Sequence, residues 1–315
     1  MILSKLSEKS GFMLDNSIIV FQQILIMLLL MLVGYVLFRK GTLDVPMTKK
    51  LSTLLNVYVG PCCIIEAFQR EFDPAMAGTL GISFLAAALI LGMSMGIANL
   101  IFPRRLPDRR VCVVLTNNGF MAIPLLTAMF GPTGVFLGTG HIVAMVIVQW
   151  TYAAGQLDRN WKFSVKKILL TPGVLASAFG LLLFVSPVKL PAPVFSAVSL
   201  LADVNTPVAM LILGAYLAQI NLNQMCSNRE VWKTTALRML LIPALTVGVL
   251  VMLPVSDMAK LVLMVAAAAP TGISAAMFAQ MFDGDYLFST RVVGLTTLLS
   301  LVLLPGWIAV LSALL

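Results

Sequence analysis

Two segments place prolines and small polar residues inside long apolar stretches, where backbone groups find few partners. The first is TNNGFMAIP (116–124) and the second is AAAAPTGISAAMFAQ (266–280). A proline removes one N–H and clashes with the carbonyl four residues earlier, so a helix bends or breaks there. The sequence predicts a half-helix that ends near Asn117, another that starts near Pro124, and a matching break at Pro270.

The chemistry expected of two such breaks is the binding of a small anion. The first N–H groups of a helix lack intrahelical partners and carry partial positive charge, so two half-helix N-termini that meet near the membrane centre suit a carboxylate. Asparagine amides and hydroxyl groups add donors without a full charge. A pair of ordinary kinks in packed helices is the alternative. The candidate substrate-binding residues are Asn117, Asn118, Gly119, Pro124, Pro270, Thr271, Gly272 and Ser274, together with Asn56 and Arg291 from other stretches.

The spacing of four prolines indicates an internal repeat. Pro61 and Pro124 are 63 residues apart, as are Pro207 and Pro270, and a shift of 146 residues maps the first pair onto the second. The same shift lays LVGYVLF over AFGLLLF. Matched helix breaks in two repeated halves are typical of the binding site of a secondary transporter.

The composition is that of a protein that crosses a membrane many times. Of its 315 residues, 60% are hydrophobic and 11% are charged, and the mean hydropathy is +1.00, whereas soluble proteins carry about 25% charged residues. The net charge of +8 does not indicate nucleic acid as a partner, because the basic residues cluster in short links between apolar stretches. The four cysteines form no C-x-x-C pair, so we expect inert thiols and no metal site.

Stretches of about 20 apolar residues predict an all-α polytopic membrane protein with ten transmembrane helices. The first stretch has no cleavage site and is followed at once by Arg39 and Lys40, so we expect it to be a retained helix. The ten predicted spans are 17–38, 50–69, 76–102, 110–130, 134–156, 166–186, 194–220, 232–253, 258–282 and 286–313.

The charges of the links predict the orientation. The links on one side carry 14 Lys and Arg residues and the other side carries five, and positively charged links stay in the cytoplasm. Both termini are therefore expected on the non-cytoplasmic side of the cell (inner) membrane. Since each half has an odd number of spans, the second half inserts upside down, which is a 5+5 inverted repeat. The predicted parts are an external N-terminal segment (1–16), a first repeat (17–156), a cytoplasmic linker (157–165) and a second repeat (166–315).

Ionisable groups inside a span are costly, so each needs a partner or a role. Asp203 lies inside a predicted span next to Asn205, and His141 is the only histidine of the chain. These three residues are candidates for binding a coupling proton or cation. A structural hydrogen bond or ordinary packing is the alternative for each of them.

Two arginines fall inside or beside the predicted spans. Arg291 is expected either to pair with Asp283 and Asp285, which are close in sequence, or to contact an anionic substrate. Arg238 lies near the cytoplasmic end of its span, and we expect its side chain to reach out to the membrane surface.

Several segments resemble motifs of the auxin efflux carrier family, which includes plant PIN-type carriers and bacterial permeases for malonate and malate. Asn117 and Pro124 match the asparagine and the proline of the family's N-x-G-F-x-G-x-P crossover, whereas Ala122 stands where the family often has glycine. The resemblance covers nearly the whole chain. The segments that carry it are GYVLFRKGTLD (34–44), LLNVYVGPCCIIEAF (54–68), TNNGFMAIPLL (116–126), NTPVAMLILGAYLA (205–218) and AAAAPTGISAAMFAQ (266–280).

The resemblance implies ten helices in the inverted-repeat fold of sodium/proton antiporters and bile-acid transporters, with crossed, broken helices 4 and 9. Helices 1, 2, 6 and 7 would form a scaffold and the surface of a homodimer. Helices 3–5 and 8–10 would form a transport core that binds substrate at the crossing and slides in an elevator-type movement.

The sequence therefore predicts a secondary active transporter of small organic anions, mono- or dicarboxylates such as malonate or malate, coupled to H⁺ or Na⁺. A sodium/proton-type cation antiporter is one alternative, although predicted helices 4, 5 and 9 contain no buried Asp or Glu. A ligand sensor that keeps the transporter fold is another. The chain has no H-E-x-x-H motif and no P-loop, so neither an enzyme nor a bound cofactor is expected.

Overall fold

The structure is a computed structural model that describes residues 22–23, 25–158, 160–162, 164–186, 188–219, 225 and 227–315. The predicted N-terminal segment 1–16 lies outside these residues. Within them the chain is all-helical, and its one β feature is an isolated bridge. Six described helices are long and apolar enough to cross a membrane, and two shorter apolar helices, Leu25–Arg39 and Pro172–Val185, accompany them. The prediction of an all-α, multi-pass membrane protein is confirmed.

The helices after Leu25–Arg39 follow one another with short links, and four π-helical turns (η) occur within three long helical segments, Val45–Phe68, Asn118–Leu157 and Arg229–Met252. The α-helices are α2 (Val45–Leu54), α3 (Gly60–Phe68), α4 (Pro74–Ile101), α5 (Pro107–Val114), α6 (Ile123–Val148), α7 (Ala154–Leu157), α8 (Val165–Leu169), α9 (Pro172–Val185), α10 (Ala192–Asp203), α11 (Asn205–Ala218), α13 (Arg229–Ala236), α14 (Ile242–Met252), α15 (Asp257–Ala268), α16 (Ile273–Met281) and α17 (Tyr286–Leu314). The π-turns are η1 (Leu55–Val59), η2 (Asn118–Ala122), η3 (Gln149–Ala153) and η4 (Leu237–Leu241).

Three of the π-turns end two residues before a proline: η1 before Pro61, η2 before Pro124 and η4 before Pro243. A π-turn widens the helix locally. The carbonyl four residues before each proline falls inside that turn, so the clash that would break the helix is relieved. The α-helix α6 begins at Ile123 with Pro124 in its first turn, as predicted, and η2 extends the helical segment back to Asn118.

A glycine bends α6 where the sequence predicts a turn between two spans. Gly131 has φ of 59° inside α6 and is followed by Pro132. This left-handed conformation is strained for residues with a Cβ atom, so α6 consists of two helical segments joined at a sharp bend. The prediction of a turn in the segment FGPTG (130–134) is confirmed.

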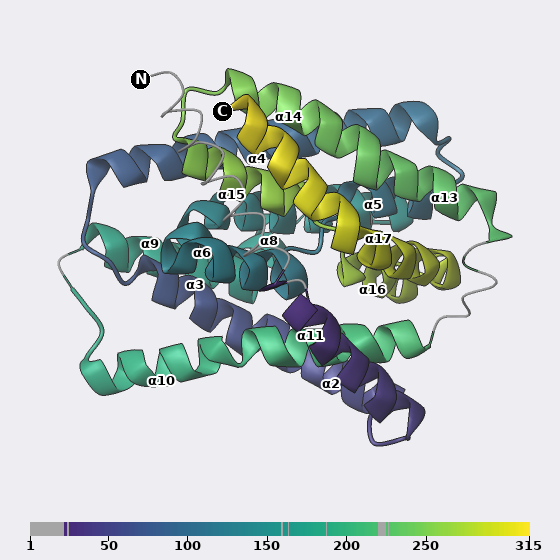
Figure 1. Cartoon of the computed structure of the whole chain (residues 1–315), viewed down its shortest axis with the longest axis horizontal. Helices are drawn as coiled ribbons and strands as arrows, with labels where there is room; N and C mark the ends of the chain where they lie inside the picture. The colour runs from purple at the N-terminus through teal and green to yellow at the C-terminus, as the bar shows by residue number, and fades with distance from the viewer. Residues whose placement is uncertain are drawn as a thin grey trace.

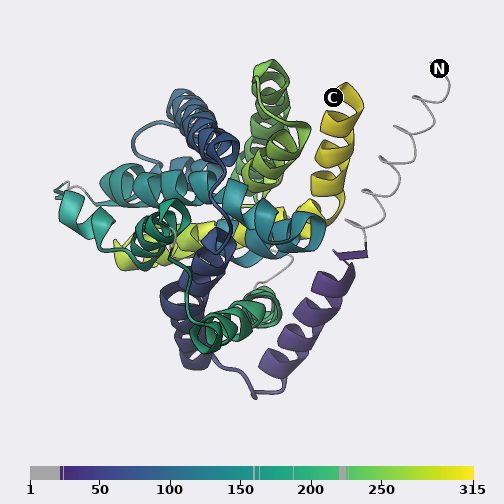
Figure 2. The same ribbon diagram turned by 90° about the vertical axis from the view of Figure 1, so that its left-hand side faces the viewer.

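The helices pack as two groups that meet along α6. In one group α3 contacts α9 and α10, and α2 contacts α11; in the other α4 contacts α5 and α6, and α15 contacts α14 and α17. Figure 1 shows α2, α3, α10 and α11 in the lower part of the molecule and α4, α14 and α17 in the upper part, and Figure 2 shows the same arrangement from the side. Because α6 also contacts α3 and α9, and η2 contacts α11, the start of this helical segment lies at the junction of the two groups.

The first described helix crosses α11 at a very short distance (Figure 1). A Cβ atom at Gly34 would overlap the backbone carbonyl of Leu211, and one at Gly214 would overlap the backbone carbonyl of Met31. The two backbones therefore touch at a pair of glycines, which is a common way for membrane helices to pack closely.

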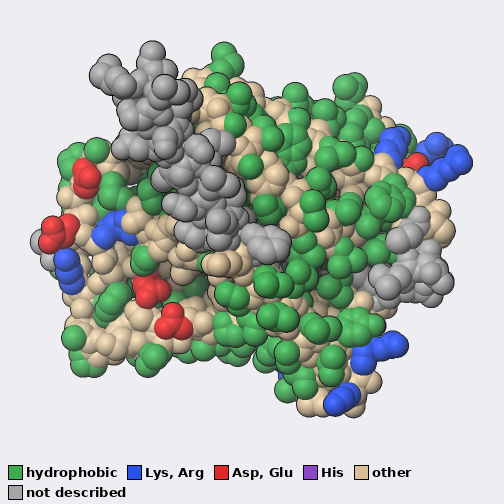
Figure 3. All heavy atoms as spheres, viewed as in Figure 1, with side chains coloured by type: hydrophobic (Ala, Val, Ile, Leu, Met, Phe, Trp, Pro, Cys, Tyr) green, Lys and Arg blue, Asp and Glu red, His purple; other side chains and the backbone are tan. Residues whose placement is uncertain are grey.

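The surface is apolar in its middle and charged at its two ends. Figure 3 shows Lys and Arg side chains gathered at one end, on the right of the view, and mixed acidic and basic side chains at the other. Large apolar residues such as Leu85, Leu100, Leu182 and Val302 are exposed on the surface, and apolar side chains cover the middle of the face in Figure 3. An apolar band flanked by charged ends is what a lipid bilayer requires of a membrane protein.

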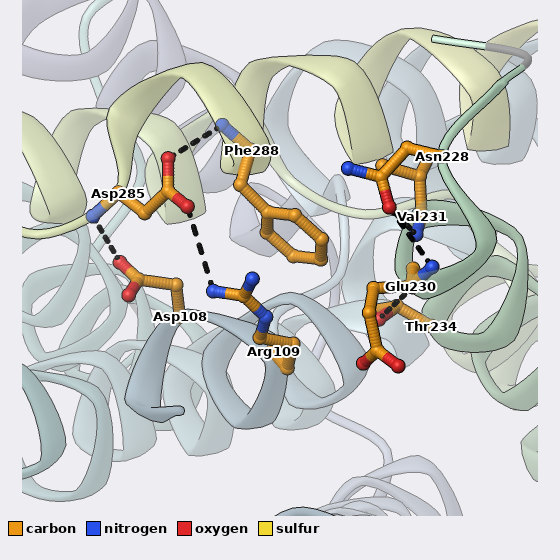
Figure 4. A network of polar contacts seen from close by, with 8 residues as sticks. All are labelled: Asp108, Arg109, Asn228, Glu230, Val231, Thr234, Asp285 and Phe288. Atoms are coloured by element: carbon orange, nitrogen blue, oxygen red, sulfur yellow. Dashed lines mark hydrogen bonds and ion pairs between the residues drawn. The ribbon is translucent and has the colours of Figure 1, made fainter. Parts of the chain in front are cut away.

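A polar network ties the start of α5 to the start of α17 (Figure 4). The backbone N–H of Asp285 donates to Oδ1 of Asp108 at 2.8 Å, and Arg109 pairs with the carboxylate of Asp285 at 3.5 Å. The guanidinium of Arg109 also lies over the ring of Phe288, 4.0 Å from its centre. Arg109 is thus a partner of Asp285 that the sequence did not predict.

Asp108 makes this network sensitive to pH. Burial raises the pKa of the Asp108 carboxyl above its ordinary value of 3.8, and the hydrogen bond from Asp285 opposes that shift only in part. A carboxyl whose pKa is raised on folding binds its proton more tightly in the folded state, so its contribution to stability grows as pH falls and is lost as pH rises through the raised pKa.

Replacing Asp108 with asparagine is therefore expected to stabilise the protein at pH 7.5 relative to the parent. The amide oxygen still accepts from Asp285, and the buried charge is gone. The difference in melting temperature between Asp108→Asn and the parent, measured in detergent from pH 7.5 to pH 5, should shrink as the pH falls. A difference that grows in the acid range would contradict this account of Asp108.

Candidate functional site

Two interrupted helices pair through their backbones in the interior of the protein. The N–H of Asn117, just beyond α5, donates to the carbonyl of Pro270 at 2.8 Å. The N–H of Gly272, just beyond α15, donates to the carbonyl of Leu115 at 2.9 Å. A membrane interior has no water to satisfy these groups, so each interrupted helix supplies the partners that the other needs. We call this pairing the crossing.

Side chains reinforce the crossing. Its central residues are Thr116 and Thr271, which form the antiparallel bridge and are both buried. The hydroxyl of Thr271 donates to the carbonyl of Cys112 at 2.9 Å, which satisfies an acceptor in the last turn of α5. The N–H of Thr271 donates to the hydroxyl of Thr296 at 3.1 Å. Thr271 therefore joins α5, α15 and α17 at one point.

Asn117 places an amide donor at the crossing without a partner for it. Its side-chain oxygen accepts from the N–H of Phe120 at 3.3 Å, which caps the start of η2. Asn117 is 3% exposed, and its Nδ2 has no hydrogen-bond partner among the described residues. A buried donor left without an acceptor costs about 1–3 kcal/mol. This donor is therefore well placed to bind an acceptor that comes from outside the chain.

Asn118 is held in one orientation by its neighbours. Its side-chain oxygen accepts from the hydroxyl of Thr116 at 2.8 Å, so its amide nitrogen is free to face His141, 3.0 Å from Nδ1. Because an amide nitrogen only donates, Nδ1 of His141 must accept, and the proton of the neutral ring lies on Nε2. His141 is fully buried, and its Nε2 has no partner among the described residues.

A cavity of about 320 Å³ opens beside the crossing, and none of its lining residues is charged. Its walls come from η1 and α3 in one group of helices and from η2, α6 and α16 in the other. Six of the residues predicted to bind substrate line it: Asn56, Asn117, Asn118, Gly119, Gly272 and Ser274.

Part of the cavity wall is formed by Gln149, Trp150 and Phe278, to which sequence reasoning assigned no role. Gln149 donates from its amide to the hydroxyl of Ser274 at 3.2 Å. Trp150 packs edge-on against Phe278, with ring centres 5.1 Å apart. All four residues line the cavity. A glutamine followed by a tryptophan inside an apolar span was the available signal, since both side chains need a hydrogen-bond partner when buried.

Gly119 is where the two groups of helices meet at the site. Its carbonyl accepts from the amide of Asn205 on α11 at 3.4 Å. Asn56 on η1 lies on its other side, because a Cβ atom at Gly119 would stand 3.9 Å from the side-chain oxygen of Asn56. Asn56 and Asn205 thus approach η2 from separate helices.

The other predicted site residues lie outside this cavity. Pro270 and Thr271 form the crossing itself, Pro124 lies within the continuous helical segment, and Arg291 is on α17. Asp203 ends α10, four residues before Pro207, and is exposed in the isolated chain. Together with Glu66 and Asn205 it lines a separate small cavity of about 80 Å³ between α3, α6 and the α10–α11 junction.

Arg238 departs most from the sequence-based prediction. It was expected to reach the membrane surface, but it is 1% exposed and is among the largest fully buried side chains. Its guanidinium donates to the carbonyls of Ala267 and Ala269, at the end of α15. The signal in the sequence was an arginine inside an apolar span without Asp or Glu within one helical turn, because such a charge must find its partners in another helix.

The crossing, its unpartnered amide donor and the uncharged cavity form a candidate binding site inside a multi-pass membrane protein. No curated protein matches the chain. A family model described as membrane transport protein matches residues 19–308. The chain therefore belongs to this family of transporters, the auxin efflux carrier family whose motifs its sequence resembles.

Proposed function

We propose that the protein is a secondary active transporter that binds a small organic anion at the crossing. The observation that carries the proposal is Nδ2 of Asn117, a buried donor without a partner among the described residues, on the wall of the cavity. A carboxylate oxygen is the acceptor that such a donor binds most strongly, because hydrogen bonds to charged groups are worth about 1.5–3 kcal/mol.

The substrate is a mono- or dicarboxylate, and the lining of the cavity favours one negative charge over two. The cavity offers amides and hydroxyls at the crossing, and Phe120, Trp150 and Phe278 elsewhere, with no cationic side chain in its lining. A second carboxylate, as in malonate or malate, would have to leave water without a countercharge, which is costly. A monocarboxylate can place its apolar body against the aromatic wall.

The architecture that we propose has ten helices in a 5+5 inverted repeat, with broken helices 4 and 9 at the crossing. The crossing supports it, because two interrupted helices from the two halves of the chain pair through their backbones there. The shift of 146 residues, which maps Pro61 onto Pro207 and Pro124 onto Pro270, supports it as well. The gathering of Lys and Arg at one end in Figure 3 supports a cytoplasmic face there, with both termini outside the cell membrane.

Transport would proceed by an elevator-type movement of the group that contains α4–α6 and α13–α17. This group carries the crossing, and the other carries Asn56 and Asn205, which approach Gly119 from the opposite side of the junction. Sliding of the first group would carry the bound anion past these amides. The group with α2, α3, α9, α10 and α11 would remain fixed and form a homodimer.

Coupling to H⁺ or Na⁺ completes the proposal. Asp203, Asn205 and His141 remain the candidates for binding the coupling ion. Asp203 on α10 and Asn205 on α11 line one small cavity together with Glu66, which favours these two residues. In Asp203→Asn, anion binding at the crossing should persist while the dependence of uptake on the ion gradient is lost.

Uptake into proteoliposomes tests the function. With an imposed pH or Na⁺ gradient at pH 7, labelled butyrate or lactate should enter at least about 10-fold faster than malonate or malate, a preference of about 1.4 kcal/mol. Absence of flux for every carboxylate, with exchange of Na⁺ for H⁺, would establish a cation antiporter instead. Carboxylate binding without flux would indicate a sensor.

A further inference from the structure

We propose that Arg238 supplies the fixed positive charge that makes the crossing select an anion, acting as a positioning and specificity-determining residue behind the cavity. This inference rests on the proposed function and names the group that determines the sign of charge of its substrate. Sequence reasoning placed Arg238 at the surface, and none of the cavity-lining residues carries a charge.

The first step is that Arg238 has a buried charge whose hydrogen-bond acceptors are neutral. Its Nε donates to the carbonyl of Ala269 at 3.2 Å, and its Nη2 donates to the same carbonyl at 2.6 Å and to that of Ala267. The three ion pairs found among the described residues involve other cations. A buried guanidinium with carbonyl partners alone leaves an uncompensated positive charge.

The second step is that this charge exceeds what the helix end requires. The C-terminus of a helix carries about half a negative charge, so a full charge at the end of α15 leaves a positive surplus. The C-terminal carbonyls of α5 are satisfied by neutral donors, the hydroxyl of Thr271 and the N–H of Gly272. Only one of the two helix ends at the crossing therefore receives a charged side chain within the described part of the chain.

The third step is the short path from this charge to the amide donor in the cavity. Ala269 precedes Pro270, whose carbonyl accepts from the N–H of Asn117 at 2.8 Å. In a medium of low dielectric constant the charge of Arg238 is screened far less than in water. An anion bound at Asn117 would supply the countercharge that Arg238 lacks.

The experiment compares a carboxylate with the neutral amide of the same shape. Binding of butyrate and butyramide, and of lactate and lactamide, is measured on the purified full-length protein by thermal stabilisation and by displacement of labelled ligand. In the parent protein, the carboxylate should bind at least about 10-fold more tightly than its amide. Parent protein that shows no such preference in either pair overturns the proposed function itself.

Arg238→Gln removes the charge and keeps amide donors for the carbonyls of α15. The carboxylate-to-amide preference should fall at least 10-fold while the affinity for the amide is retained, because a purely structural loss would weaken both ligands alike. Arg110→Gln is the matched control, since Arg110 is also buried and donates to the carbonyl of Phe102 at the end of α4. An unchanged preference in Arg238→Gln, or an equal loss in Arg110→Gln, overturns the inference.

Arg238→Lys keeps the inference testable if the glutamine variant fails to fold. A buried lysine can lose its proton at alkaline pH, whereas arginine stays charged. The preference for carboxylate over amide should therefore fall between pH 7 and pH 9.5 in Arg238→Lys and remain constant in the parent. A parallel pH response in both proteins would assign the charge selectivity to another group.

Discussion

Replacing Asn117 with aspartate should weaken carboxylate binding at least about 100-fold. The aspartate oxygen can still accept from the N–H of Phe120, so the cap of η2 is kept. The change removes the unpartnered Nδ2 donor and puts an acceptor in its place. Loss of a hydrogen bond to a charged group costs about 1.5–3 kcal/mol, and repulsion between two carboxylates adds to this.

The matched control is Asn99→Asp. Asn99 lies on α4 outside the cavity, and its side-chain oxygen accepts from the hydroxyl of Tyr152 at 2.8 Å, a bond that aspartate can also accept. Isothermal titration calorimetry of both variants with the best-bound monocarboxylate distinguishes the effect on affinity of losing the donor at the cavity from the effect of adding a negative charge to the protein. Parent-like affinity in Asn117→Asp would remove the central observation behind the proposed function.

Replacing Gly214 with alanine should destabilise the protein more than any other single methyl group added to a helical glycine. The new Cβ would overlap the carbonyl of Met31, so the helix Leu25–Arg39 would have to move away from α11. Overpacking typically costs about 1–3 kcal/mol, and contact with rigid backbone places this site at or above the upper end.

Gly248→Ala provides the comparison for this change. Gly248 lies on α14 with nothing within 4 Å of the position that a Cβ would take, so the alanine is expected to add about 0.5–1 kcal/mol of stability. Thermal melting in detergent should therefore move the two variants in opposite directions. A Gly214→Ala protein as stable as the parent would show that the helix Leu25–Arg39 is free to shift.

Composition and local sequence were enough to predict the class of fold and the location of the helix interruptions. Charge is scarce and apolar stretches are long, and a bilayer leaves such a chain little choice but helices. The interruptions beside Asn117 and Pro270 follow from residues that cannot continue a regular helix. The family follows from motifs spread along the whole chain.

The sequence could not show how each proline is accommodated. Pro124 and Pro270 look alike in sequence, yet a π-turn absorbs the first and an extended break contains the second. The difference depends on groups from distant helices, because the break at Pro270 is stabilised by the backbone N–H of Asn117 and by the guanidinium of Arg238. Local propensity contains no information about donors that arrive from another part of the chain.

The bridge between Thr116 and Thr271 also governs when the site can form. Its partners are 155 residues apart, and a chain is synthesised from its N-terminus. Until the second half has been inserted, Leu115 and Asn117 lack the carbonyl and N–H groups that satisfy them. Contacts of such long range close late and slow the folding of a chain. A partly synthesised chain therefore lacks the crossing, and the proposed binding site can form only after the second half has been inserted.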